Sequence, residues 1–297
     1  MARTGYSTAS ATCLSWRRRP WCVARIIALA GAILAIWGTV VAWDIQDPYE
    51  GAVRSDSQQV GTCHEFQTEF EASSLSDVAP PVPCDQPHQT ETYLVGELPE
   101  DAGTVDGERP GREATVALTR ELCDGSQLAA YLGAEYYDEH WFVAAWPRVP
   151  TPQEWARGER MYRCDVSPSA EGQLPTMAQS MKDILRTRAG DDFRRCFDAV
   201  GVAVPCSREH VAESVRSWVP IPGDVDPAAI PQEWAERSCT PIVSEFLGRD
   251  VRRTDYRIQA VAYPDVTPAV AQCRLLVPAG AQPIIGSLST TIREGEA

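Results

Sequence analysis

The chain has 297 residues, of which 23% are charged, and its formal net charge is −14 at pH 7. A surface this acidic repels the phosphate backbone, which excludes nucleic acid as a partner. Lys182 is the only lysine among 27 basic residues, and asparagine is absent. Such a scarcity of lysine and asparagine is typical of proteins from high-GC bacterial genomes, so we expect a bacterial protein.

The earliest predicted element is an apolar run at residues 26–43, with the sequence IIALAGAILAIWGTVVAW. A membrane-spanning helix needs about 20 apolar residues, whereas the apolar region of a cleaved signal peptide usually has about 7–15. Arginines precede the run and acidic residues follow it, so the positive-inside rule places residues 1–25 in the cytoplasm. We therefore expect a single-pass plasma-membrane protein whose stalk, residues 44–61, and later domains are extracytoplasmic.

Eight of the ten cysteines follow the apolar run, in what is expected to be an oxidising compartment. An even number of cysteines there predicts disulfides, and two groups of four each allow three pairings. We favour pairing first with second and third with fourth in each group. The disulfide candidates are Cys63, Cys84, Cys123 and Cys164 in the first group and Cys196, Cys206, Cys239 and Cys273 in the second.

The frame C-x3-H-x2-E occurs twice. VPCDQPHQTE at residues 82–91 is echoed by VPCSREHVAE at residues 204–213. The motif residues, which are structural or ligand-binding candidates, are Pro87, His88, Glu91, His210 and Glu213.

Further shared features follow each frame in the same order. A cysteine-bearing helix closed by Leu-Gly is predicted at residues 122–133 and 238–248. A β-type run with an aromatic-Pro stop follows each helix, and a last cysteine closes each copy. The order predicts two homologous α+β domains, at residues 62–170 and 191–280.

Three smaller elements complete the predicted organisation. Thr151, Pro152 and Glu154 form a capping-box pattern at a helix start. The linker, residues 171–190, contains an apolar pattern typical of a helix, and residues 281–297 are expected to be a short tail. The apolar positions of the linker helix are Met177, Met181, Ile184 and Leu185.

The motifs of the first copy resemble the septum formation domain family. They are GTC, VPCDQPHQTE, the cysteine-bearing helix and a closing W-x2-G-x-R-x3-C segment, with Trp155, Gly158, Arg160 and Cys164. The resemblance implies an extracytoplasmic or membrane-anchored domain of high-GC Gram-positive bacteria with a role in division or the envelope, and it implies no reaction. In the second copy Glu209 replaces Pro87, and the W-x2-G-x-R stretch is missing.

The frame has two interpretations, a zinc site and a structural corner. Zinc uses cysteine, histidine and carboxylate ligands, so Cys84, His88 and Glu91 are one candidate set. An oxidising compartment opposes free thiolates, and Pro83 and Pro87 oppose a regular helix that would align the ligands. A structural interpretation fits better: the imidazole and the carboxylate hydrogen-bond each other or nearby backbone and fix a chain corner beside a disulfide.

The sequence contains no G-x-S-x-G, H-E-x-x-H or S-x-x-K hydrolase pattern, which opposes a hydrolase.

The expected fold class is α+β, with one N-terminal transmembrane helix followed by two small disulfide-stapled domains. The expected function is that of a membrane-anchored, non-enzymatic binding or scaffold protein of the envelope, with no metal or cofactor and with another envelope or division protein as partner. The alternative is an envelope enzyme or metal-dependent sensor that uses the C-x3-H-x2-E segment.

Overall fold

The structure is a computed structural model, and it describes residues 59–66, 75–76, 80–99, 102, 107–123, 125–169, 176–263 and 266–295. Residues 52–297 form one compact unit. No helix in the described ranges is long and apolar enough to cross a membrane. The expected membrane helix at residues 26–43, its cytoplasmic tail and most of the stalk lie outside these ranges.

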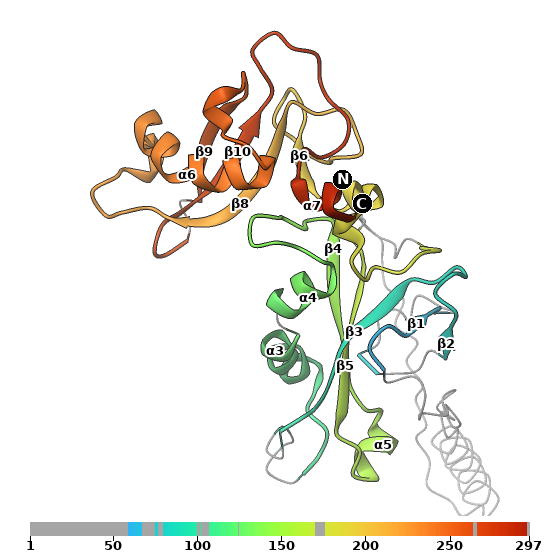
Figure 1. The fold of residues 1–297 in the computed structure, drawn as a ribbon. Coiled ribbons are helices and arrows are strands. Elements are labelled where there is room, and N and C mark those ends of the chain that lie inside the picture. The colour runs from blue at the N-terminus through green and yellow to red at the C-terminus, as the bar shows by residue number, and fades with distance from the viewer. Residues whose placement is uncertain are drawn as a thin grey trace, which may run out of the picture. The chain divides into compact units, whose positions relative to one another are not determined.

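Two antiparallel sheets of five strands organise the described chain, with the orders β2-β1-β3-β5-β4 and β7-β6-β8-β10-β9 (Figure 1). The strands of the second sheet follow the same order as those of the first, so the two sheets have the same topology. The first sheet comprises β1 (Cys63–His64), β2 (Pro81–Val82), β3 (Thr90–Glu97), β4 (Val143–Arg148) and β5 (Met161–Pro168). The second comprises β6 (Arg195–Phe197), β7 (Ala203–Pro205), β8 (Ala212–Pro220), β9 (Arg257–Tyr263) and β10 (Val270–Leu276).

Helices cover each sheet and supply its core. The α-helices are α3 (Arg112–Leu122), α4 (Gly125–Tyr131), α5 (Pro152–Ala156), α6 (Gln232–Leu247) and α7 (Thr290–Gly295), and the 3-10 helices are η1 (Ile184–Arg186), η2 (Arg188–Asp192), η3 (Pro227–Ala229) and η4 (Val251–Arg253). The α+β class is therefore confirmed. Helix α6 ends at Gly248, whose φ of 62° is left-handed, as the Leu-Gly signal predicts. A Cβ at Gly248 would meet Thr290 Cγ2 at 2.4 Å, so glycine is also needed for α7 to pack there.

Four disulfides join the cysteines first to second and third to fourth in each group, as favoured from the sequence. The pairs are Cys63–Cys84, Cys123–Cys164, Cys196–Cys206 and Cys239–Cys273. The first disulfide of each group ties the strand next to the edge, β1 or β6, to the turn after the edge strand, β2 or β7. The second ties a helical region to a central strand and lies among the core residues. In the chain-entropy model, a disulfide that closes a loop of tens of residues adds about 3–4 kcal/mol to the free energy of unfolding.

The W-x2-G-x-R stretch forms a closed turn between α5 and β5. Thr151 caps α5, and both hydrogen bonds of the predicted capping box with Glu154 are present. The Trp155 ring enters the first core and donates its N–H to the Gly107 carbonyl at 2.8 Å. Arg160 stacks 3.8 Å above the same ring after a left-handed turn that the glycine at 158 permits. The residues of this motif therefore serve to pack the turn and to shape it.

The prediction of an α-helix in residues 171–190 is wrong. Met177, Met181, Ile184 and Leu185 are buried in the first core as expected, but the only helical turns described there are η1 and η2. A helix would join the Met181 N–H to the Met177 carbonyl. Instead the Met177 carbonyl accepts from the His88 N–H at 2.9 Å, and the Met181 N–H donates to Glu91. Tertiary hydrogen bonds therefore replace the helical one.

The segment after residue 280, expected to be a tail, is instead built into the fold. Ile284 pairs with the backbone of His210, and Ile292 is fully buried on α7. Ser287 and Ser289 are also buried and hydrogen-bonded. The sequence gives little sign of this, because the partners lie far away in the chain.

Candidate functional site

The histidine of the frame fixes a chain corner in the first copy. His88 is fully buried, and its Nδ1 lies 2.8 Å from the Gln86 carbonyl. Its backbone pairs in both directions with Met177, at 2.9 and 2.7 Å. Because the segment from Met177 onward returns beside the frame, the corner is closed by residues almost ninety positions later. The neighbouring Pro87 is exposed and makes the entry to this corner.

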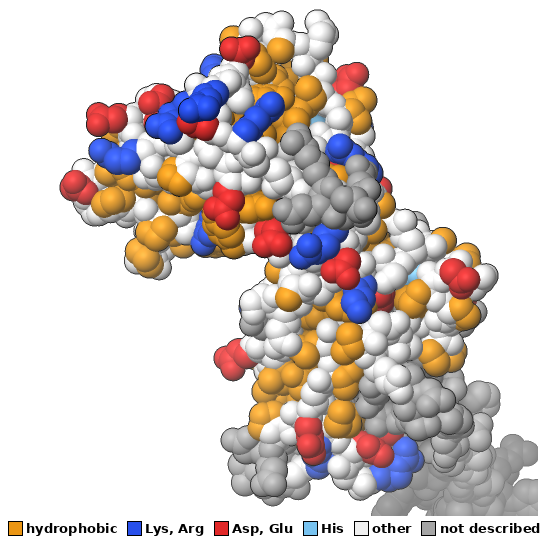
Figure 2. Space-filling model, in the orientation of Figure 1, with side chains coloured by type: hydrophobic (Ala, Val, Ile, Leu, Met, Phe, Trp, Pro, Cys, Tyr) orange, Lys and Arg blue, Asp and Glu red, His pale blue; other side chains and the backbone are white. Residues whose placement is uncertain are grey.

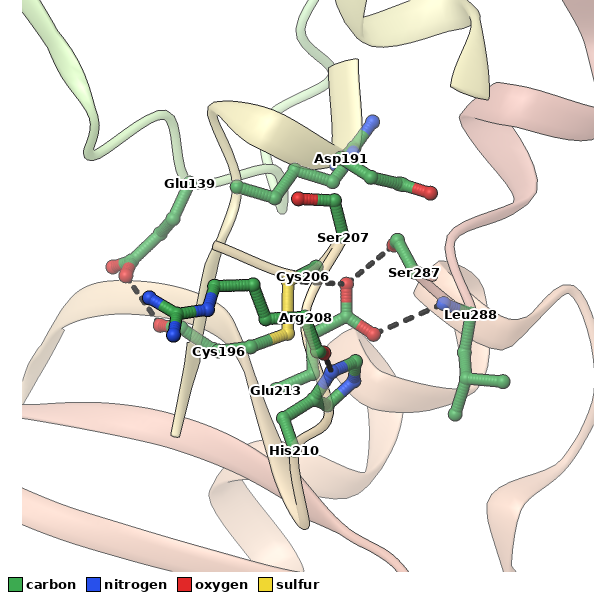
Figure 3. Close-up of a disulfide and its surroundings, with 12 residues drawn as sticks. Glu139, Asp191, Cys196, Cys206, Ser207, Arg208, His210, Glu213, Ser287 and Leu288 are labelled. Carbon is green, nitrogen blue, oxygen red and sulfur yellow. Dashed lines mark hydrogen bonds between the residues drawn. A yellow bond between two sulfur atoms is a disulfide. The ribbon is translucent and has the colours of Figure 1, made fainter. Parts of the chain in front are cut away.

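The second copy repeats this arrangement. His210 is 1% exposed, its Nδ1 lies 2.8 Å from the Arg208 carbonyl, and its backbone pairs with Ile284 at 3.0 and 2.9 Å. Figure 3 shows the imidazole beside the Cys196–Cys206 disulfide. Burial lowers the pKa of His210, so this ring is neutral at pH 7.

The glutamate of each frame holds the returning segment. Glu91 is 1% exposed and accepts from the Tyr131 hydroxyl, the Ser180 hydroxyl and the Met181 N–H. These bonds satisfy a carboxylate that would otherwise be costly to bury.

In the second copy Glu213 accepts the same two kinds of hydrogen bond, one from a serine hydroxyl and one from a backbone N–H. It accepts from the Ser287 hydroxyl and, at 3.0 Å, from the Leu288 N–H (Figure 3). The Cys206 sulfur lies 3.8 Å from a Glu213 oxygen, but a disulfide sulfur carries no hydrogen, so we read this as a contact only. Burial raises the pKa of Glu213 to about 7, against the lowering effect of the Leu288 and Ser287 hydrogen bonds.

The returning segments share a pattern that sequence reasoning missed. The sequences are MAQSM at residues 177–181 and IIGSL at residues 284–288. The first residue pairs with the histidine, the serine hydroxyl binds the glutamate, and the final N–H binds it too. An apolar residue followed three and four positions later by serine and an apolar residue is the signal, but it is too short to be found without the structure.

The first sheet buries a charged cluster beside this corner. Asp165 lies between two arginines, with Arg163 Nε at 3.0 Å and Arg148 Nε at 3.5 Å, and all three side chains are fully buried. Burial alone would raise the pKa of this carboxyl, but Arg163, followed by His64 and Arg148, outweighs burial and holds the pKa below its usual value. Thr92 adds a hydrogen bond at 2.9 Å.

The second sheet fills the corresponding place differently. By alignment of the last cysteines, Arg274 stands where Asp165 does, and it stacks 3.6 Å from Phe197. The facing acid is Glu139, which comes from the loop between α4 and β4 and accepts from Ser214 and, at 3.0 Å, from Gln272. Burial raises the pKa of Glu139, while the Ser214 hydrogen bond lowers it. One copy thus supplies a partly buried acid to the other.

The loop that carries Glu139, residues 135–139, inserts into the second copy and is here called the clasp. Asp138 pairs with Arg194 and accepts from Thr291 at 2.8 Å and Ser289 at 3.1 Å. Tyr137 belongs to the second core and meets Phe246 edge-on at 5.9 Å. In Figure 1 this loop runs from α4 toward β8. No local sequence pattern predicts this insertion.

An exposed cluster of aromatic rings and arginines lies beside the clasp. Arg195 stacks 3.7 Å from the Trp141 ring and donates to the Tyr263 hydroxyl at 3.1 Å. Trp218 stacks on Tyr263 with 5.9 Å between the ring centres. Trp141 and Trp218 remain 52% and 62% exposed. We call this set, with Phe197 and Arg274, the aromatic–arginine cluster.

Trp218 has an unusual backbone. Its φ is 68°, a left-handed conformation that is a strained outlier for a bulky residue. The pairing of β8 with β10 shifts register here: Val219 faces Ala271, whereas Arg216 faces Cys273. Trp218 therefore lies in a β-bulge, a feature that re-aims side chains.

Two groups of metal-binding residue types lie close together. Cys63, His88 and Glu91 form one group, and Cys196, Cys206 and His210 form the other, with all ligand atoms in each group within 4.8 Å. Cys84, the remaining member of the candidate zinc set, is bonded to Cys63. A sulfur held in a disulfide is not a thiolate, so neither group can act as a thiolate metal site in this state.

Comparison with known families gives a match. The family model described as Septum formation matches residues 60–269, a range that covers both frames, the first sheet and the second sheet up to β9. No curated protein and no solved structure matches the chain.

Proposed function

The chain belongs to the septum formation family, and on that premise we propose that it is a membrane-anchored, extracytoplasmic, non-enzymatic binding protein that acts in septum formation. The apolar run at residues 26–43 supports the anchor, and the arginines before it support a cytoplasmic N-terminus. The frame residues support a structural role for the motif, because each glutamate and the Nδ1 of each histidine are engaged in holding the fold.

Trp218 is the observation that carries the binding function. Its bulged, left-handed backbone is costly, and the side chain it presents is mostly exposed rather than buried. Strain of this kind persists where the surrounding structure enforces it, and it gathers at functional positions. The rest of the aromatic–arginine cluster has the composition of protein-binding hot spots, in which tryptophan, tyrosine and arginine are enriched.

The partner that fits is another protein of the division site. Acidic, basic and hydrophobic side chains are interspersed on the face drawn in Figure 2, as on a soluble surface. Against that background, Trp141, stacked by Arg195, and Trp218, stacked on Tyr263, offer rigid apolar anchors with polar edges. Such anchors bind a protein surface with little loss of side-chain entropy.

Localisation in dividing cells tests the proposal. A fluorescent fusion of the full-length protein should gather at septa, and deletion of the gene should delay or misplace division. The double variant Trp141→Ala with Trp218→Ala should stay folded and leave the septum. Val200→Ala is the control, because Val200 is 83% exposed and does not belong to the cluster. An even distribution of the wild-type fusion, with normal division after deletion, would refute the septal role.

A further inference from the structure

Both histidines of the frames carry a buried nitrogen with no hydrogen-bond partner among the described residues. Each Nδ1 faces a backbone carbonyl, and because a carbonyl can only accept, Nδ1 must carry the hydrogen. The other nitrogen, Nε2, is then a lone-pair acceptor in the neutral ring. In His88 and in His210 this Nε2 is buried and unpartnered. An unsatisfied buried acceptor is costly, and the same cost appears twice.

Cysteine sulfurs of the first disulfide in each copy lie close to these histidine rings, because the ligand atoms of each cluster are within 4.8 Å of one another. The cluster of the second copy, Cys196, Cys206 and His210, is completely buried. The cluster of the first copy contains Cys63, His88 and Glu91. A disulfide sulfur cannot donate a hydrogen to Nε2. Opening of the disulfide, or the arrival of a cation, gives the lone pair a partner.

We propose that each cluster is a redox-gated site for a zinc-class divalent cation. A dithiol reductant opens the disulfide by exchange, so that the protein disulfide becomes two thiols while the reductant becomes a disulfide. The cation then binds both thiolates and the histidine Nε2, and the two thiol protons pass to solvent. Oxidation by a disulfide-forming oxidant reverses the step and expels the cation.

The donor set matches the chemistry of zinc. Two thiolates and an imidazole are ligands that a zinc-class cation prefers, and a fourth position remains for a carboxylate or water. A ligating histidine ordinarily donates its other N–H to a carbonyl or carboxylate, which fixes its tautomer. Both His88 and His210 already make that bond. In the first copy an oxygen of Glu91 lies within the cluster as the fourth donor.

The remaining disulfides keep the fold while these two open. Cys123–Cys164 and Cys239–Cys273 join helical regions to central strands inside the two cores. The gated pairs close shorter loops, with separations of 21 and 10 residues against 41 and 34. Opening them therefore restores less chain entropy to the unfolded state. This inference does not depend on the proposed septal function.

The test uses the full-length protein, treated with a phosphine reductant that is not a thiol, and then titrated with Co²⁺ as the probe. Alkylation followed by peptide mass analysis identifies the disulfides that have opened, and circular dichroism monitors folding. We expect Cys63–Cys84 and Cys196–Cys206 to open in the folded protein. A thiolate-to-cobalt charge-transfer band and the visible bands of tetrahedral Co²⁺ should appear, with one cation for each cluster, and Zn²⁺ should displace it.

Single variants separate the two clusters. His210→Ala should remove the cation of the second cluster and His88→Ala that of the first, each weakening Co²⁺ binding at its own cluster by at least about tenfold. His210→Gln and His88→Gln preserve side-chain bulk if an alanine variant unfolds. His140→Ala is the matched control, because His140 also has a buried, unpartnered nitrogen but belongs to neither cluster.

Three results would overturn the proposal. The first is opening of these disulfides without a charge-transfer band. The second is opening that occurs only as the protein unfolds. The third is unchanged Co²⁺ binding in folded histidine variants. None of these results would bear on septal localisation, so failure here is distinct from failure of the proposed function.

Discussion

Glu91 and Glu213 occupy equivalent places but are held by different donors. Tyr131 gives Glu91 a hydroxyl donor, whereas the equivalent position in the second copy is Phe246. Glu213 therefore lacks that donor, and burial raises its pKa to about 7. At the scale of single residues, one hydroxyl separates two otherwise equivalent corners.

The raised pKa of Glu213 predicts a specific pH dependence. Its folded-state pKa of about 7 exceeds the unfolded value of about 4.3, so the folded state binds more protons between these values. The stability that protonation contributes is complete below about pH 4.3 and is lost as pH rises through about 7, a change of at most about 3–4 kcal/mol. Urea unfolding between pH 4 and 8 should show a flatter profile for Glu213→Gln than for the wild type. Parallel profiles would contradict the assignment.

Tyr131→Phe tests the first corner in the same way. The substitution places in the first copy the residue that the second copy has, and it removes one donor to a buried carboxylate. We expect a loss of about 1.5–3 kcal/mol in the free energy of unfolding, as for hydrogen bonds to charged groups. The control is Tyr256→Phe, because Tyr256 is only partly buried and donates no hydrogen bond to a carboxylate in the described part of the chain. Equal effects of the two substitutions would show that the Glu91 bond contributes little.

At the scale of elements, the segments at residues 177–181 and 284–288 each pack beside the frame of one copy. Each makes a single backbone bridge to a histidine and then delivers a serine and an N–H to a glutamate. They belong to no sheet, and buried polar bonds hold them together with apolar contacts to the two cores. Their removal should therefore affect the core.

Truncation of the chain after Pro283 tests this role of the second segment. The shortened chain leaves Glu213 buried without Ser287 and Leu288 and removes the fully buried Ile292. We expect a loss of at least about 3 kcal/mol and a correspondingly lower melting temperature by calorimetry. Truncation after Gly295 leaves all of these contacts and should melt like the full chain. Equal melting of both truncations would mean that the segment is a tail after all.

Local signals predicted local features of the fold well. The capping box at Thr151, the left-handed helix end at Gly248 and the cysteine pairing depend on short spacings or on compartment, and each is confirmed. The linker failed because its apolar spacing is consistent with a helix, while the carboxylate that captures the Met181 N–H lies 90 positions away. The candidate site divided in the same way. His88 and Glu91 were identified from their motif, but the clasp and the bulged Trp218 depend on pairings that no local pattern records.

On the scale of the whole compact unit, the clasp joins the two copies through two acids, of which Asp138 is buried and Glu139 partly buried. Asp138 meets Arg194, Ser289 and Thr291, and Glu139 meets the second sheet. Breaking a buried ion pair from one side leaves an uncompensated charge, which costs more than the pair contributes. The two sheets should therefore unfold together.

Asp138→Ala should uncouple them. It leaves Arg194 buried without its carboxylate, which costs about 3–5 kcal/mol, and it loosens α7 by removing the bonds to Ser289 and Thr291. Hydrogen exchange should then show faster exchange in the second copy than in the first, whereas the wild type is expected to exchange as one cooperative unit. Asp224→Ala, at an exposed position, is the control and should exchange like the wild type. Cooperative unfolding of the Asp138 variant would refute the coupling.

The clasp also has a consequence for synthesis. The partners of Asp138 follow it in the chain by 56, 151 and 153 positions. A ribosome has therefore to translate through Thr291 before the acids of the clasp find all their partners, although the first sheet is complete at residue 168. A nascent chain that stops before Thr291 is therefore expected to carry an incompletely hydrogen-bonded Asp138 carboxylate beside a finished first sheet.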